Sequence, residues 1–150
     1  MGHSYTSSLY HVVFSTKGRA MSITKEMQPK LWSYMGGIAR AHKIKPHEIG
    51  GAEDHAHLMI SIPSTMAIAK AVQLIKGGSS KWINDHYGDL RDFEWQEGYG
   101  AFSIGVLQKE NTRKYIRSQA RHHKRQTFKE EFLGFLKKHD LEYDSRYVWG

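Results

Sequence analysis

Two histidines spaced two residues apart, His55 and His57, mark the first place where this sequence could do chemistry, in the run DHAHLMISI at residues 54–62. The apolar residues after the pair predict a buried strand. Side chains alternate between the faces of a strand, so both imidazoles leave the same face, with Cα atoms roughly 7 Å apart. Imidazoles at that spacing can bind one metal ion, while Ala56 points to the opposite face.

A second candidate group lies in the basic segment Lys109–Arg125, which contains a single acid, Glu110. Tyr115 and Gln119 stand four positions apart, so a helix here would place them on one face. The tyrosine oxygen can act as a nucleophile, and the glutamine amide oxygen can bind a hard divalent cation. A solvated basic face is the commoner explanation of such a segment, but the histidine pair favours the nucleophile hypothesis.

These groups fit phosphodiester chemistry. Cationic side chains can hold a DNA backbone. A free tyrosine has a pKa near ~10 and is a poor nucleophile at neutral pH, so a metal ion that polarises the scissile phosphate would assist the attack. A covalent phosphotyrosine would conserve the energy of the broken bond, so that strands could be rejoined without ATP.

The composition agrees with an anionic partner. The chain of 150 residues has 22 Lys and Arg against 15 Asp and Glu, a net charge of +7, which favours nucleic acid or an anionic surface. With no cysteine, a disulfide framework and a thiolate metal site are excluded. No apolar run approaches the ~20 residues of a membrane helix, and residues 1–8 lack a signal-peptide core, so we expect a cytoplasmic protein.

Hydrophobic periodicity and turn residues predict eight elements that must position these groups. The last helix begins with a capping-box pattern, Thr127 with Glu130 three residues later. The predicted strands are Leu9–Ser15, Ile44–Ala52, the histidine strand and Gly100–Leu107, and the predicted helices are Ser22–His42, Met66–Asp85, the basic helix Asn111–Arg125 and Phe128–His139.

This order predicts an α+β fold, a ferredoxin-like (RRM-like) antiparallel sheet with the pattern βαββαβ and additional C-terminal helices that carry the tyrosine. The length predicts a single domain, residues 1–150. The first and third strands are central in this topology, so the histidine pair would sit on a rigid part of the sheet.

Two further features leave alternatives open. His11, in the first strand, fits a packed or hydrogen-bonded side chain better than a metal ligand. Gly77-Gly78, in the middle of the second helix, indicates either a kink or a surface of small residues that meets a phosphate or another helix.

Taken together, the sequence resembles the single-tyrosine HUH transposases of insertion sequences, the TnpA type, and the related REP-associated tyrosine transposases. The resemblance covers nearly the whole chain. The matching runs are YHVVFSTK at residues 10–17, DHAHL at 54–58, SSKW at 79–82, WQEGYGAF at 95–102, and YIRSQ at 115–119 with His122-His123 after it.

The resemblance implies a role for each matching residue. His55 and His57 would be the HUH metal ligands, Tyr115 the catalytic tyrosine and Gln119 the third ligand, on the same helix. Ala56 departs slightly from the bulkier residue usual between the histidines, and Glu53 stands where the family often has proline. We expect DNA contacts from Lys17, Arg19, Lys81, Arg113, Lys114, Arg117, Arg121, His122 and His123.

The activity implied is that of a DNA transposase of bacterial or archaeal type. It would cut single-stranded DNA near hairpins at the ends of a mobile element, join Tyr115 to a 5′ phosphate and release a 3′ hydroxyl. The family works as a homodimer and often exchanges the tyrosine helix between subunits. The cofactor would be Mg²⁺ or Mn²⁺; the histidines alone would equally suit Zn²⁺.

Other classes fit less well. A cupin-type enzyme would need an all-β pattern and a carboxylate soon after the histidines, and a metal-dependent hydrolase barrel would need a longer chain. An HUH nicking endonuclease of the replication type usually carries further domains or tyrosines. The alternative from a different functional class is a non-catalytic, domesticated nucleic-acid-binding protein that binds its ligand through the basic helix.

Overall fold

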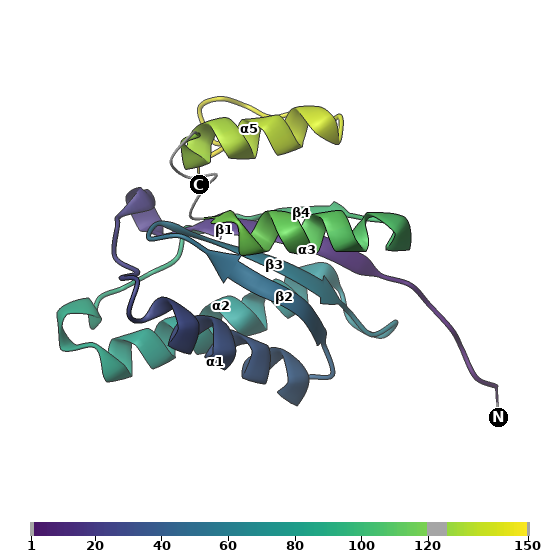
Figure 1. Cartoon of the computed structure of the whole chain (residues 1–150), viewed down its shortest axis with the longest axis horizontal. Helices are drawn as coiled ribbons and strands as arrows, with labels where there is room; N and C mark the ends of the chain where they lie inside the picture. The colour runs from purple at the N-terminus through teal and green to yellow at the C-terminus, as the bar shows by residue number, and fades with distance from the viewer. Residues whose placement is uncertain (1, 120–125, 150) are drawn as a thin grey trace.

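The computed structural model describes residues 2–119 and 126–149 and consists of one antiparallel sheet between two layers of helices (Figure 1). The strands are β1 (Leu9–Ser15), β2 (Lys45–Gly51), β3 (His55–Ser61) and β4 (Gly100–Ser103), in the spatial order β2-β3-β1-β4. Strands β1 and β3 are therefore central, as the topology predicted. The architecture confirms the expected ferredoxin-like α+β sheet with additional C-terminal helices.

Helices lie against both faces of the sheet (Figure 1). Helices α1 (Gln28–Ala41) and α2 (Ile68–His86) pack on the first face. Helices α3 (Lys109–Arg117) and α5 (Phe128–Lys138) lie on the second. Short 3-10 turns at Lys17–Arg19, Gly88–Leu90 and Val106–Gln108 complete the described elements.

Strand alternation separates the main core from the face that carries the histidines. On the first face, Phe14 of β1 and Ala56 and Leu58 of β3 are buried in the main core against α1 and α2. The intervening residues of β3, His55 and His57, point to the second face. Ala56 therefore fills a packed core position, since no part of it is exposed.

The two C-terminal helices are anchored on either side of the histidines. In α3, Ile116 packs with Leu9 and Met59, and a Cβ atom on Gly50 would lie only 3.0 Å from its side chain. In α5, Phe128, Phe132 and Leu136 pack with Val13 and Phe102. The histidines consequently lie in the seam between α3 and α5.

The edge strand β2 accommodates residues that a central strand would not. Pro46 lies in it, and the pairing with β3 shifts register between Pro46 and Glu48. Proline removes one ladder donor and is tolerated at a sheet edge or a bulge. The strand ends at Gly51, where a Cβ atom would lie 2.2 Å from the carbonyl oxygen of His55, so a glycine allows the turn that leads into the histidine strand.

Several predicted boundaries were wrong. The first helix begins at Gln28 rather than Ser22 because Pro29 occupies its first turn. The fourth strand ends at Ser103 rather than Leu107 because a 3-10 turn follows. The basic helix begins at Lys109 and ends at Arg117, and Ser118 caps it in a non-helical conformation. The remainder of the predicted basic helix, residues 120–125, lies outside the described residues.

The Gly77-Gly78 pair lies inside an uninterrupted α2. A Cβ atom on Gly78 would lie 2.8 Å from Ile38 of α1, so the glycine lets the two helices approach closely. This supports the alternative in which a small residue meets another helix.

No helix in residues 2–119 or 126–149 is long and apolar enough to cross a membrane.

The crowding at Gly51 predicts a stability effect. We expect Gly51→Ala to lower the free energy of unfolding by about 1–3 kcal/mol, because the new methyl group must displace backbone of the histidine strand. The matched control is Gly77→Ala, at a position where a Cβ atom meets nothing within 4 Å. This substitution should raise the free energy of unfolding by about 0.5–1 kcal/mol, because alanine favours the helix more than glycine does. Urea unfolding measures both, and equal effects of the two substitutions would contradict the steric argument.

Candidate metal centre and nucleophile

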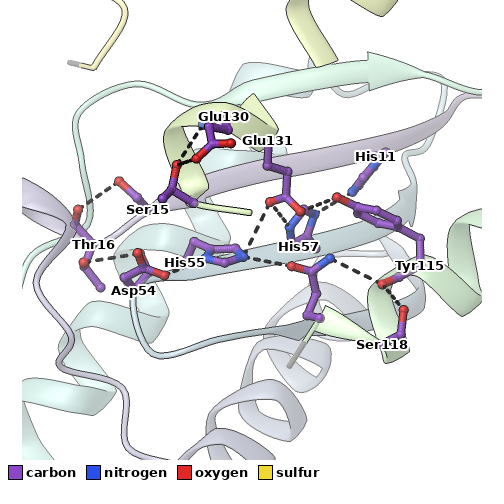
Figure 2. Close-up of polar contacts among 12 residues, drawn as sticks. His11, Ser15, Thr16, Asp54, His55, His57, Tyr115, Ser118, Glu130 and Glu131 are labelled. Carbon is purple, nitrogen blue, oxygen red and sulfur yellow. Dashed lines mark hydrogen bonds and ion pairs between the residues drawn. The ribbon is translucent and has the colours of Figure 1, made fainter. Parts of the chain in front are cut away.

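The imidazoles of His55 and His57 project from β3 beneath α5 and are almost completely buried (Figure 2). Their Nε2 atoms face side-chain oxygen atoms from two other parts of the chain. His55 Nε2 lies 2.9 Å from Oε1 of Gln119, and His57 Nε2 lies 2.9 Å from Oε1 of Glu131. The strand thus presents both Nε2 atoms toward the same small volume.

Hydrogen bonds on the inner nitrogens fix the orientation of both rings. His55 Nδ1 lies 2.7 Å from Oδ1 of Asp54, and His57 Nδ1 lies 2.8 Å from Nε2 of His11. Burial lowers the pKa of His11 well below its usual value, so this neutral imidazole can accept the Nδ1 proton of His57 when a metal ion occupies the Nε2 side. Partners of this kind leave each Nε2 lone pair available for a metal ion. His11 is therefore a buried supporting residue, as its isolated position in β1 predicted.

Glu131 of α5 completes this cluster and was missed by the sequence analysis. Thr127 accepts a hydrogen bond from the backbone N–H of Glu130 and so starts α5 as the capping-box pattern predicted. One turn in, Glu131 points at the histidines, with Oε1 also 3.6 Å from His55 Nε2. A signal was present, because Glu131 interrupts the apolar face formed by Phe128, Phe132 and Phe135, and a buried carboxylate needs a partner.

The environment of Glu131 strongly favours its charged form. Burial raises the pKa of this carboxyl, but the hydrogen bond with His57 and the charges of both imidazoles outweigh it and hold the pKa at about 2. The carboxylate is therefore ionised at every physiological pH and can serve as a ligand without losing a proton first.

Tyr115 of α3 lies against the same carboxylate. Its hydroxyl donates a hydrogen bond to Oε2 of Glu131 (Figure 2), and its ring packs edge-on against His57 and Phe135, with centroid distances of 5.7 Å to each. Burial raises the pKa of Tyr115, and the adjacent negative charge and hydrogen bond raise it further. The resting hydroxyl is thus protonated and aimed at the histidine cluster.

Gln119 reaches the cluster by a different route from the one expected. It lies one residue beyond Ser118, where α3 ends, and is itself in helical conformation, so the helix is interrupted between Tyr115 and Gln119. Its Nε2 donates to the backbone carbonyl of Tyr115 at 3.3 Å, which directs its Oε1 toward His55. The position of the side chain agrees with the expectation, although the predicted continuous helix does not.

The donor atoms fit a divalent metal ion. One ligand atom each from His55, His57 and Glu131 lies within 4.8 Å of the others, and the amide oxygen of Gln119 adjoins them. Two imidazoles with a carboxylate and an amide oxygen suit Mn²⁺, and the two oxygens also suit Mg²⁺. Zn²⁺ also binds imidazole nitrogens and carboxylate oxygens.

The residues expected to contact DNA are distributed over both layers. Lys81 lies on α2, on the opposite side of the sheet from the histidines, and pairs with Asp85 at 2.9 Å. Lys17 pairs with Glu94 at 2.8 Å, and the guanidinium carbon of Arg19 lies 5.6 Å from the ring centroid of Trp149.

The basic residues of α3 lie nearer the candidate centre. Arg113 and Arg117 both approach Glu48 of β2, at 3.7 and 3.1 Å, while Lys114 is exposed. Arg121, His122 and His123 lie outside the described residues.

Comparisons of sequence point to one family. The family model described as "Transposase IS200 like" matches residues 4–119. The transposase for insertion sequence element IS200 of Salmonella typhimurium is 27% identical over 128 residues, which cover 79% of this chain and 81% of that protein. The ISDra2 transposase TnpA of Deinococcus radiodurans is 29% identical over 124 residues, which cover 79% of this chain and 89% of that protein.

Comparisons of structure identify the same fold. A crystal structure from Deinococcus radiodurans R1, assigned as a transposase, aligns with a TM-score of 0.65 at 20% identity and covers 79% of this chain and 96% of that one. The REP-associated tyrosine transposase bound to a REP hairpin aligns with a TM-score of 0.59 at 15% identity and covers 82% and 73%. At these identities the two structures establish the fold.

The hydrogen bond from His55 to Asp54 predicts an indirect effect on metal affinity. We expect Asp54→Asn to weaken Mn²⁺ binding about 10- to 100-fold, because an amide orients the imidazole less firmly and makes it less basic. The control is Glu53→Gln, the same change of charge one residue earlier. Electron paramagnetic resonance of free Mn²⁺ measures both affinities, and similar values for the two variants would rule out the supporting role.

Proposed function

Because this chain belongs to the family of IS200-like transposases, we propose that it cleaves and rejoins single-stranded DNA at hairpin-bearing element ends through a 5′-phosphotyrosine. The proposal treats residues 1–150 as one HUH transposase domain. It makes the protein a metal-dependent endonuclease and strand transferase, with Tyr115 as the nucleophile. It assigns His55, His57, Gln119 and also Glu131 as ligands of Mg²⁺ or Mn²⁺.

The observation that carries the proposal is the position of the Tyr115 hydroxyl. It shares the carboxylate of Glu131 with His57, so the nucleophile and the candidate metal ligands meet at one group. A tyrosine that only packed in the core or stacked on a base would not require this buried carboxylate.

The proposed reaction follows from the state of these groups. The Tyr115 oxygen attacks the scissile phosphorus, the bond to the 3′ oxygen breaks, and the released strand ends in a 3′ hydroxyl. A bound divalent ion would supply the positive charge that polarises the phosphate. The Tyr115 hydroxyl is hydrogen-bonded to Glu131, so its proton can pass toward that carboxylate as the new P–O bond forms, and the departing 3′ oxygen takes up a proton. The reverse steps rejoin the strands.

All the proposed ligands and the nucleophile come from a single chain in this structure. Tyr115 and Gln119 lie against the histidines of their own polypeptide, and the proposal takes this cis arrangement. The homodimer expected from the resemblance stays part of the proposal. Light scattering tests it: we expect twice the mass of the chain, and a monomer with full strand-transfer activity would refute the dimer.

The proposed substrate is single-stranded DNA with a hairpin. One structural relative was solved bound to a REP hairpin, and the net charge of +7 in the present chain suits a phosphate backbone. We assign the backbone contacts to the basic residues named above, with those of α3 closest to the candidate site.

A further prediction of this proposal concerns the covalent intermediate. Hairpin-bearing single-stranded DNA incubated with the protein and Mn²⁺ should give an adduct that survives denaturing electrophoresis. Tyr115→Phe should form none, because the ring remains but the attacking oxygen is gone. EDTA should also prevent the adduct in the wild-type protein.

The matching control separates catalysis from binding. His55→Ala should lose cleavage yet bind the same hairpin within about a factor of three in a gel-shift assay, since the imidazole is buried and expected to act only through the metal. Tight binding by the wild-type protein without an adduct on any hairpin would favour the non-catalytic nucleic-acid-binding protein instead.

Another prediction concerns the basic helix. The logarithm of the DNA affinity should fall linearly with the logarithm of salt concentration, and Lys114→Ala should reduce that slope by about 1. Lys30→Ala, an exposed lysine of α1 on the other side of the sheet, should leave the slope unchanged. Fluorescence anisotropy measures both, and a slope insensitive to Lys114 would remove α3 from the DNA interface.

A further inference from the structure

A pocket of about 340 Å³ opens beside Tyr115, between α3 and α5. Its inner end is formed by His11 and the Tyr115 ring, so it leads directly to the proposed nucleophile. Its volume falls in the range of small-ligand sites, about 300–1,000 Å³. None of the functions assigned above uses this space.

One wall of the pocket is polar and belongs to α3 and the turn before it. It consists of Gln108, Asn111 and Thr112. The Gln108 amide oxygen accepts from the backbone of Gly105, and the Thr112 hydroxyl donates to the carbonyl of Gln108. The Asn111 amide, by contrast, has no hydrogen bond to any residue within 2–119 or 126–149. It therefore offers both a donor and an acceptor to a ligand.

The opposite wall is aromatic and cationic and belongs to the C-terminal half of α5. Phe135 presents its ring edge-on to Tyr115, and His139 stacks on Phe102 with a centroid distance of 4.7 Å. Lys138 lines the same wall and forms no ion pair with any other residue that the structure describes. The wall thus combines aromatic rings with a positive charge that no acidic side chain of the described residues pairs.

We infer that this pocket binds one deoxynucleotide of the substrate strand next to the scissile phosphate. The nucleobase would lie against the rings of Phe135 and His139 with an edge on Asn111, and its phosphate would approach Lys138. The inference rests on the proposed function, since it takes Tyr115 as the attacking residue. It adds a protein site that reads a base at the point of cleavage.

The chemistry of the walls favours a nucleotide over a plain anion or an apolar ligand. Single-stranded nucleic acid is held by cations along the backbone and by aromatic rings that stack on bases. An asparagine amide can pair with two atoms on the edge of a base. A single lysine would suffice for a phosphate ion, but it would leave the aromatic wall and Asn111 without a role.

The test uses the four deoxynucleoside 5′-monophosphates and the full chain in EDTA, so that a metal ion cannot hold the phosphate. Binding is followed by two-dimensional NMR titration. We expect at least one mononucleotide to shift resonances of α3 and α5 around the pocket. Lys138→Ala should weaken its binding about tenfold, whereas Lys137→Ala, the same change on the neighbouring residue outside the pocket, should alter it less than twofold.

Base recognition is tested by a second variant. Asn111→Ala should bring the affinities of the four mononucleotides to within about twofold of one another. In wild-type cleavage assays, an abasic site should reduce the rate at one position next to the cut, and Asn111→Ala should lose that sensitivity.

The outcomes separate this inference from the proposed function. No mononucleotide binding, or equal losses for Lys138→Ala and Lys137→Ala, would overturn the pocket assignment even if the Tyr115 adduct forms. Specific binding in the pocket without any Tyr115 adduct would support the nucleotide site and refute the proposed cleavage chemistry.

Discussion

The carboxylate of Glu131 is the group on which the second face of this protein depends. A buried charge is costly unless it is paired and hydrogen-bonded. Here its partners come from two elements: both imidazoles of β3, at 2.9 and 3.6 Å, and the Tyr115 hydroxyl of α3. Since Glu131 itself belongs to α5, one side chain joins the three elements that build the site. The apolar contacts of Ile116 and Phe132 hold the helices on the sheet, but they do not select the position of the tyrosine oxygen.

The sheet allows this arrangement because one face packs in the main core and the other carries the histidines. Alternation along β1 and β3 sends Phe14 and Leu58 into the main core and His11 and His57 into the site. The core face supplies a rigid platform, so the imidazoles need only short hydrogen bonds to Asp54 and His11 to fix their orientation. Function is thereby placed on a strand rather than on a mobile loop.

Much of the fold was readable from sequence because hydrophobic periodicity and turn residues act locally. Strand β1 and the Thr127 cap of α5 were predicted to the residue, and the central place of β3 followed from the topology. The tertiary environment decided the rest. Neither proline nor glycine marks the break at Ser118 in the sequence. The direction of Glu131 depends on how α5 packs over Val13 and Phe102. Periodicity indicates which face of a helix is apolar. It cannot identify the partner of a single carboxylate within that face, because the partner belongs to another element of the fold.

On the proposed function, the same contacts imply a resting state in which the Tyr115 hydroxyl is held in position but stays protonated. Burial and the neighbouring carboxylate raise the pKa of Tyr115, so the fold by itself stabilises the protonated phenol. A divalent ion among the histidines would weaken this effect, because it would share the negative charge of Glu131. A DNA phosphate bound beside the metal ion would then be the electrophile for the Tyr115 oxygen, whose proton would be held less tightly than in the absence of the metal. On the proposed function, the buried carboxylate therefore makes cleavage depend on both the metal ion and the DNA. The metal ion would offset the charge that raises the pKa of Tyr115, and the DNA would supply the phosphate that the tyrosine attacks.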